Sequence, residues 1–566
     1  MTSLPKVKTQ RGRKLAWRNG PLEANDPLMA WQGLLDARNM GESDAFFTPR
    51  LSDLPDPDAM QDMDKAADRV VQAVMGSELI HIFGDFDADG VNGTAILVEA
   101  LRGAGAAVSF SIPHRAEDGH GIDASVVREV VATGVRFGIS VDTGTTCFDA
   151  CIEAKKLGLD LIITDHHLPE SELPDAFALL NPARRDCGFA DRKLCGTGVA
   201  FFLLMSVWKR LKEKGKPPAY DLRQLLDRVA VATVADVMDL VGVNRVLVHH
   251  GLQRLNSTPS MGMAALMQVA RVRKAVTTET IGFYLAPRIN AAGRMRHGEE
   301  AMRLLSTPDA DEAAKLAGVL DETNKQRRKV EVEVFKQAET RLNGLDTLAV
   351  YDKGWHAGVV GLAAGRLARK HGRPAAVGFV TPDDRIRISL RGRPEFHVGE
   401  LLNACSDYLE GFGGHAGAGG GTIRAGAWDD FVAAFGSAVL EQQKSAGEAH
   451  IQAIDGVLAL GAMHIGLAER LQRFEPVGHG NPACTWLVRD VHIADRRDLK
   501  GGVVRLKLSD GTCWLDAIAF NGNGLSDVLQ SGQIVSLVGQ LQKDDWRGGD
   551  AIQFIVEDAL TSEPEG

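Results

Sequence analysis

The sequence predicts an α/β protein of several domains that ends in an all-β module. The chain has 566 residues, which is too long for a single hydrophobic core, and its 45% hydrophobic and 24% charged residues are typical of a folded globular protein. From about Leu79, short apolar runs alternate with amphipathic stretches, which indicates parallel sheets covered by helices. From about His450, apolar runs follow one another with only turns between them.

The first α/β unit is predicted from four apolar runs, LIHIF, FGISV, LDLIIT and FALLNP, which helical stretches at 91–101 and after Cys147 interrupt. Parallel sheets place their chemistry at the carboxyl ends of the strands. The polar residues that follow the first three runs are Asp85, Asp87, Asp89, Asp142, Asp165, His166 and His167. The sequence therefore predicts that carboxylates and imidazoles meet at one edge of this sheet.

The middle of the chain predicts helices and then a second α/β unit. Asp236 lies near the end of the helical run LLDRVAVATVADVMDL, and the charged stretch 309–342 predicts a long connecting helix. The second unit begins near Leu348 with the strands LAVYD, PAAVGFV and IRISL and a helix at 359–370. The glycine-rich segment GFGGHAGAGGG follows them.

The last part of the chain predicts a barrel of the OB type. Five runs rich in β-branched residues, TWLVRDVHIA, VVRLKL, CWLDAIAF, GQIVSLVGQLQ and DAIQFIVEDA, are joined by Gly, Asp and Asn turns. Their number and spacing are those of a five-stranded OB barrel, a fold that often binds single strands. A β-rich packing module without a ligand remains the alternative.

The acidic cluster predicts a site for divalent metal ions. Taken alone, GDFDADG would also fit a solvated turn or a calcium loop, but position twelve from Asp85 is Ile96, where an EF-hand loop needs Glu. Hard oxygen ligands with one or two imidazoles favour Mn²⁺ or Mg²⁺ over zinc. More ligands are present than one ion requires, which favours two ions and the hydrolysis of a phosphate ester.

Several motifs together resemble a known family. DFDADG, VDTG, TDHH and VADV occur in the order found in the DHH phosphoesterase superfamily, and GWHAGVVGLAAGRLA, SLRG and GGHAGAGG resemble its DHHA1 domain. With APRINAAGRM between them and an OB barrel after them, the layout over 79–559 resembles the RecJ family of bacterial exonucleases, which degrade single-stranded DNA from 5′ to 3′.

The resemblance implies a division into five parts. These are a basic, flexible and helical segment at 1–70, a DHH catalytic domain at 71–270, a connecting helical region at 271–345, a DHHA1 substrate-binding domain at 346–447 and an OB nucleic-acid-binding domain at 448–566.

The resemblance also implies the roles of individual residues. The implied metal ligands are Asp85, Asp87, Asp89, Asp142, Asp165, His166, His167 and Asp236. Asp142, His166 and His167 are expected to be catalytic, with Asp142 bridging the two ions, while Asp165 either binds a metal or orients a histidine. The implied substrate-binding residues are Arg115, Arg288, Asn290, Arg294, His356, Ser389, Arg391 and His415. Arg115 matches the family's contact to the 5′ end, where a guanidinium would enforce polarity, and a surface arginine remains the alternative.

The expected function is therefore a single-strand-specific 5′–3′ exonuclease that releases mononucleotides in DNA recombination and repair, with two Mn²⁺ or Mg²⁺ ions as cofactors. Its expected partners are single-stranded DNA, a single-strand-binding protein and a helicase. We expect a cytoplasmic protein without a membrane partner, because the seven cysteines form no disulfide pattern and no apolar run could cross a bilayer. The net charge of −10 leaves phosphate binding to local basic clusters such as RIRISLRGR.

Two other functions remain open. Relatives with DHH and DHHA1 domains include nano-RNases, cyclic dinucleotide phosphodiesterases and pyrophosphatases, which are shorter and generally lack an OB barrel. A non-catalytic scaffold that holds single strands is the alternative from another class, but such proteins typically lose metal ligands, and every candidate ligand is present here.

Overall fold

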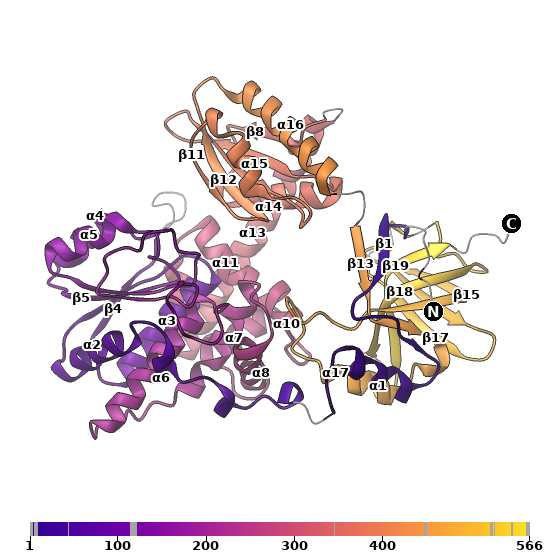
Figure 1. The fold of residues 1–566 in the computed structure, drawn as a ribbon, viewed down its shortest axis with the longest axis horizontal. Coiled ribbons are helices and arrows are strands. Elements are labelled where there is room, and N and C mark those ends of the chain that lie inside the picture. Colours follow the sequence, from indigo (N-terminus) through magenta and orange to yellow (C-terminus); the bar gives the residue numbers. More distant parts are fainter. Residues whose placement is uncertain are drawn as a thin grey trace. The chain divides into compact units, whose positions relative to one another are not determined.

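The computed structural model describes residues 4, 9–42, 45–113, 121–343, 346–446, 450–520, 524–525, 527–544 and 547–561. The chain forms two compact units, one of residues 51–447 and one that combines residues 1–50 with residues 448–566 (Figure 1). The division expected from the sequence instead treats 1–70 as a segment of its own. No helix among the described residues is both long and apolar enough to cross a membrane.

The first sheet of the larger unit has five strands, and all of its pairings are parallel. In spatial order the strands are β4 (Val108–Ser111), β3 (Ile80–Phe83), β5 (Phe137–Val141), β6 (Asp160–Thr164) and β7 (Ala178–Leu180). The sequence did not predict β4, whose residues VSFS include only one buried side chain, Val108. Because every strand runs the same way, all their carboxyl ends lie along one edge.

Helices cover both faces of this sheet, as the uninterrupted apolar runs predict (Figure 1). Alternate residues of one strand face different cores: Ile162 packs into the core on one face, and Leu161 and Ile163 pack into the core on the other. The helices of the first face are α2 (Met63–Gly76), α3 (Ala88–Gly103) and α6 (Gly196–Glu213). Those of the second face are α4 (Ala124–Ala132) and α5 (Phe148–Leu157).

A helical region connects the two sheets of the larger unit. It consists of α7 (Leu226–Ala235), α8 (Gly242–Ser257), α9 (Met261–Val269), α10 (Thr278–Thr280), the π-helical turn η5 (Ile281–Leu285), α11 (Ala286–Met295), α12 (Glu299–Ser306) and α13 (Ala310–Leu342). Helix α13 is the predicted connecting helix. Its first half contributes Leu320 to the first core, and its second half contributes Val334 and Leu342 to the core of the second sheet.

The second sheet is mixed: its pairing of β8 with β9 is parallel, and its other pairings are antiparallel. In spatial order its strands are β11 (Leu409–Gly414), β12 (Ala418–Ile423), β10 (Ile386–Arg391), β9 (Ala375–Val380) and β8 (Ala349–Asp352). Its helices are α14 (Ala357–His371), α15 (Val398–Ala404) and α16 (Trp428–Ala446). The glycine-rich segment therefore forms the hairpin of β11 and β12 at one edge.

The smaller unit contains the predicted five-stranded barrel. Its strands are β15 (Trp486–Leu499), β16 (Val503–Ser509), β17 (Trp514–Ala519), β18 (Ile534–Lys543) and β19 (Ile552–Thr561). The strand order β16-β17-β19-β18-β15 is closed by the pairing of β16 with β15, which makes the sheet a barrel.

Residues 9–42 of the amino-terminal segment are folded onto this barrel unit, whereas the sequence predicts a flexible segment; residues 51–70 belong to the larger unit. Strand β1 (Arg13–Trp17) pairs with β13 (His450–Ile454), and β2 (Glu23–Ala24) pairs with β14 (Gly456–Leu458). Helix α1 (Pro27–Ala37) packs against α17 (Ile465–Gln472). The basic residues Arg38 and Arg18 lie 3.0 and 3.6 Å from carboxylate oxygens of the buried Asp455.

Candidate metal centre

The predicted carboxylates and imidazoles meet at the carboxyl edge of the first sheet. Asp85, Asp87 and Asp89 follow β3, Asp142 follows β5, the Asp165–His167 run follows β6, and Asp236 follows α7. Their ligand atoms form three overlapping groups, each with all atoms within 4.8 Å of one another. The groups are Asp85, Asp87 and Asp142; Asp89, His166 and Asp236; and Asp142, Asp165, His166 and His167.

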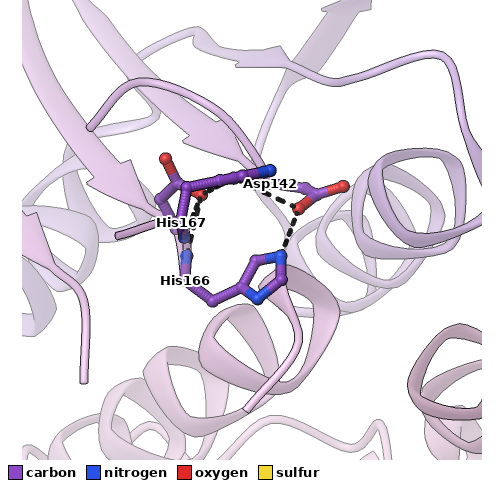
Figure 2. Close-up of side chains that lie close together, drawn as sticks. Asp142, His166 and His167 are labelled. Atoms are coloured by element: carbon purple, nitrogen blue, oxygen red, sulfur yellow. Dashed lines mark hydrogen bonds and ion pairs between the residues drawn. The ribbon is translucent and has the colours of Figure 1, made fainter. Parts of the chain in front are cut away.

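Asp142 belongs to two of these groups, and His166, which also belongs to two, links them to the third. Oδ1 of Asp142 lies 3.1 Å from Nε2 of His166 and 4.0 Å from Nδ1 of His167 (Figure 2). Its backbone has φ of 61°, in the left-handed region that non-glycine residues adopt rarely and mostly where the surroundings require it. A Cβ on Gly196 would lie 2.6 Å from Cα of Asp142, so only glycine lets α6 approach this closely.

Asp236 enters the site from the end of a helix. Helix α7 closes with a Schellman motif, in which Met238 N donates to Thr233 O at 3.1 Å and Val237 N donates to Val234 O at 3.2 Å. Val237 occupies the left-handed position of this motif with φ of 57°, where glycine is usual. This ending places Oδ2 of Asp236 at 3.5 Å from Nε2 of His166.

The electrostatics of the site favour a cation. Burial, together with the neighbouring carboxylates of Asp89, Asp87, Asp85 and Asp236, raises the pKa of Asp142 well above its usual value. Burial and the carboxylates of Asp89 and Asp87 likewise raise the pKa of Asp236 to about 8. Oδ1 of Asp142 and Oδ2 of Asp236 are buried and accept no hydrogen bond. Buried, mutually repelling oxygens of this kind fit Mn²⁺ or Mg²⁺ as ligands.

The two histidines have different environments. Burial lowers the pKa of His166, which therefore stays neutral at pH 7 and keeps a lone pair available to a metal. A hydrogen bond with Asp165 raises the pKa of His167 to about 9, and their atoms Nδ1 and Oδ1 lie 2.7 Å apart. In the absence of a metal ion, the two adjacent imidazoles thus differ in charge.

Asp165 is engaged in hydrogen bonds within the protein. Its Oδ2 accepts from the backbone N–H of Thr145 at 2.9 Å, and its Oδ1 accepts from that of His166 at 2.7 Å. Burial opposes the ionisation of Asp165, but the hydrogen bond and charge of His167 and the hydrogen bond from the N–H of Thr145 outweigh it and hold its pKa below the usual value. These contacts favour the orienting role over the ligand role, both of which the sequence left open.

Backbone donors at the start of α6 were not predicted. Gly196 N donates to Oδ2 of Asp89 at 2.7 Å, and Thr197 N donates to Oδ1 of the same carboxylate at 2.8 Å. A carboxylate at a helix amino terminus also interacts favourably with the helix dipole. The signal in the sequence was LCGTG, in which glycines open a helix after a loop, so that its free N–H groups can face a nearby acid. Asp87 caps α3 through the N–H of Asp89 at 2.9 Å.

The substrate residues predicted in the first domain and in the connecting region have different positions. Arg115 lies outside the described residues. Arg288 is buried, with its Nη2 2.8 Å from Oδ1 of Asp321. Oδ1 of Asn290 accepts from the N–H of Ala88, in the GDFDADG loop, at 2.7 Å. Arg294 Nη1 donates to the carbonyl of Gly358, in α14, at 3.3 Å. Helix α11 thus contacts both the GDFDADG loop, which we call the metal loop, and the second α/β domain.

Two of the substrate residues predicted in the second domain, Ser389 and Arg391, contact each other. Nη1 of Arg391 donates to Oγ of Ser389 at 3.1 Å, and both lie on β10. A Cβ on Gly361 of α14 would lie 2.9 Å from that Oγ, so the helix packs directly on these side chains. His356 caps α14 by accepting from the N–H of Gly358 at 3.0 Å. His415 is exposed in the turn between β11 and β12.

Comparisons with known proteins agree with this architecture. Family models match the DHH family N-terminal domain over residues 79–233, the DHHA1 domain over 344–441 and the RecJ OB domain over 454–558. The single-stranded-DNA-specific exonuclease RecJ of Dickeya dadantii is 32% identical over 583 residues, covering 98% of this chain and 97% of that protein. This chain belongs to the RecJ family.

Other members of the RecJ family extend the comparison. The protein of that name from Bacillus subtilis is 33% identical over 527 residues, which cover 92% of this chain and 66% of that one. The crystal structure of RecJ from Thermus thermophilus with Mn²⁺ superposes with a TM-score of 0.79 at 27% identity, covering 96% of this chain and 80% of that chain. The structure of the same protein with Mg²⁺ gives a TM-score of 0.73 at 26% identity, covering 96% of this chain and 78% of that chain.

These findings confirm two predictions from the sequence. The chain has the DHH, DHHA1 and OB domains of the RecJ family in the predicted order. The fold class is also confirmed, with a parallel-sheet domain, a long connecting helix, a second α/β domain and a carboxyl-terminal barrel.

Proposed function

We propose that this protein is a metal-dependent exonuclease that degrades single-stranded DNA from 5′ to 3′ and releases mononucleotides. The observation behind the proposal is that Asp142 belongs to two groups of ligand atoms at once. A carboxylate in that position can bridge two ions. Membership of the RecJ family supplies the substrate class, because its curated members are named single-stranded-DNA-specific exonucleases.

The cofactors in this proposal are two Mn²⁺ or Mg²⁺ ions held by Asp85, Asp87, Asp89, Asp142, His166, His167 and Asp236. Bound there, such ions would polarise a phosphodiester and lower the pKa of an attacking water. The protein's own side chains prepare the site. His166 stays neutral and offers Nε2, while Asp165 keeps a proton on Nδ1 of His167 and fixes the orientation of that ring.

The strand would be held by the second α/β domain and by α11. Ser389 and Arg391 present a hydroxyl and a guanidinium close together, and His356 and His415 lie at a helix start and a turn of the same domain. A guanidinium matches the geometry of a phosphate group, so Arg391 and Arg294 are suited to the DNA backbone. In this proposal Arg115 binds the terminal 5′ phosphate and thereby sets the polarity.

The cellular setting follows from the substrate. Single strands arise where a helicase opens a duplex, and a single-strand-binding protein covers them, so both are partners in the proposal. The work would take place in the cytoplasm during DNA recombination and repair.

The test is digestion of end-labelled single- and double-stranded DNA, with either the 5′ or the 3′ end blocked, in Mn²⁺, in Mg²⁺ and in chelator. We expect mononucleotides from the single strand only, a stop when the 5′ end is blocked, and no product in chelator. Rapid cleavage of dinucleotides or pyrophosphate with intact long single strands would refute the exonuclease and favour a small-substrate phosphodiesterase. Strand binding without cleavage under any metal would favour a scaffold.

A further inference from the structure

Two neighbouring aromatic side chains are exposed on the turn that precedes α11. Phe283 is 68% exposed and Tyr284 is 50% exposed, and both lie in the π-helical turn η5. Scattered exposed apolar residues are ordinary on protein surfaces. Within the described ranges, however, no other two consecutive Phe, Tyr or Trp residues are both exposed. π-Helical turns are rare and occur frequently at functional sites.

A stripe of partly exposed residues runs from this pair to the metal loop. Along η5 and α11 the residues that reach the surface on this stripe are Phe283, Pro287, Asn290 and Arg294, while those between them on the opposite side are buried. Asn290 accepts from the N–H of Ala88 in the metal loop. It lies seven residues after Phe283, or about 10 Å along a helix axis. The aromatic pair and the metal loop are therefore joined by one continuous helical surface.

The backbone that carries the pair is also anchored in the core of the larger unit. The turn η5 packs against α7, the helix that ends at Asp236. The carbonyl of Tyr284 accepts from Nη1 of Arg288 at 2.6 Å, and the guanidinium of Arg288 is fixed by its ion pair with Asp321. Ile281 and Leu285, on either side of the exposed residues, are fully buried. The two rings thus project from an anchored backbone.

We infer that Phe283 and Tyr284 form a stacking platform for the bases of single-stranded DNA on their way to the metal centre. This inference rests on the proposed function and adds a binding site to it. Every base has a π-face, so stacking on an aromatic ring tolerates any sequence, which suits an enzyme that must pass all four bases. The bases of a duplex are already stacked on their neighbours, so the platform favours single strands.

The first experiment measures binding without cleavage. In the full-length protein with Asp142→Asn to prevent hydrolysis, we compare Phe283→Ala and Tyr284→Ala with Phe283→Trp, which keeps a ring. Ile152→Ala, which truncates an exposed side chain on α5, is the matched control. The probe is a 5′-phosphorylated oligo(dT) labelled for anisotropy. We expect each alanine variant to raise Kd by roughly five- to a hundredfold, and the tryptophan and Ile152 variants to bind within about twofold of the parent.

The second experiment detects the stacking itself. An oligonucleotide with 2-aminopurine near its 5′ end should lose fluorescence on binding to the parent protein and recover it with Phe283→Ala. In the active protein, the same variant should raise KM for single-stranded DNA and leave kcat nearly unchanged, since the metal ligands are intact. Unchanged circular dichroism and Tm would confirm that the variants are folded.

The outcomes separate the two proposals. If the unaltered protein cuts single strands while both alanine variants bind DNA and quench 2-aminopurine as the parent does, the stacking platform is refuted and the exposed pair is better explained as a contact for a protein partner. If the unaltered protein neither binds nor cuts single strands, the proposed function is refuted, and this inference with it.

Discussion

Nε2 of His166 lies 3.1 Å from Oδ1 of Asp142, so the ends of β6 and β5 each contribute one side chain to the same point. Burial keeps the imidazole neutral and raises the pKa of the carboxyl group. Without a metal ion, the imidazole therefore offers no positive charge to the carboxyl group. A bound cation would relieve the repulsion between the neighbouring carboxylates that raises this pKa.

Mn²⁺ should stabilise the folded protein through Asp142. A ligand that binds only the folded state stabilises it by about 2.7 kcal/mol at a hundredfold excess over Kd. We expect Tm to rise with Mn²⁺ in differential scanning fluorimetry and to fall again with chelator. Asp142→Asn, which removes one charge and tolerates the left-handed backbone, should abolish both this shift and hydrolysis without lowering Tm in chelator. Asp149→Asn, an exposed acid on α5, is the control, and an equal Mn²⁺ shift in the Asp142 variant would contradict the ligand assignment.

Gly196→Ala should disable the site by steric conflict. The added Cβ would lie 2.6 Å from both Cα and Cβ of Asp142. A side-chain rotation moves neither of these two atoms, so the conflict cannot be relieved in that way. We expect kcat to fall by at least about tenfold, because a small displacement of a reacting group is costly, and Mn²⁺ affinity to fall as well. Gly198→Ala in the same helix meets no atom closer than 3.5 Å and should leave both unchanged. Similar kinetics for the two variants would contradict the close packing.

Much of the catalytic edge could be predicted because its signals are local. Strands with every residue buried, such as FGISV, are predominantly apolar, and the aspartate that follows is then at the strand end. Strand β4 was missed because its side chains SFS are only partly buried at the edge of the sheet. Asp236 was placed near a helix end by its sequence alone, but its approach to His166 depends on how α7 packs.

The remaining features depend on contacts between distant parts of the chain. Arg288 is a candidate phosphate ligand by its motif, but it is buried against Asp321, which lies on another helix. The basic amino-terminal segment has the composition of a flexible tail, yet Arg18 and Arg38 have a buried partner in Asp455. Single-sequence patterns indicate which residues are charged, but they do not show which charges are neutralised on folding.

Asp455→Asn should release the amino-terminal segment from the barrel unit. Asp455 is 3% exposed and pairs with Arg38 and Arg18, and removing one partner of a buried ion pair typically costs about 3–5 kcal/mol. We expect a lower Tm for this unit and faster proteolysis within residues 9–42. Asp498→Asn breaks an exposed pair with Arg496 on the same barrel and should change neither. Equal protease resistance of the two variants would refute the anchoring role of Asp455.

His81 should make the larger unit sensitive to mild acid. Burial of this side chain in β3 lowers its pKa to about 4, and its two ring nitrogens lie 2.9 and 3.0 Å from the hydroxyls of Ser109 and Ser111. The unfolded chain takes up the proton near pH 6.5, whereas the folded chain does so only near pH 4, so stability is full above pH 6.5 and decreases as the pH falls between these values. The decrease should reach about 3 kcal/mol. His81→Gln keeps a polar side chain that does not titrate, so urea unfolding from pH 7 to pH 4.5 should show a smaller loss of stability for this variant than for the unaltered protein. Parallel pH curves for the two proteins would show that His81 is charged or accessible in the folded state.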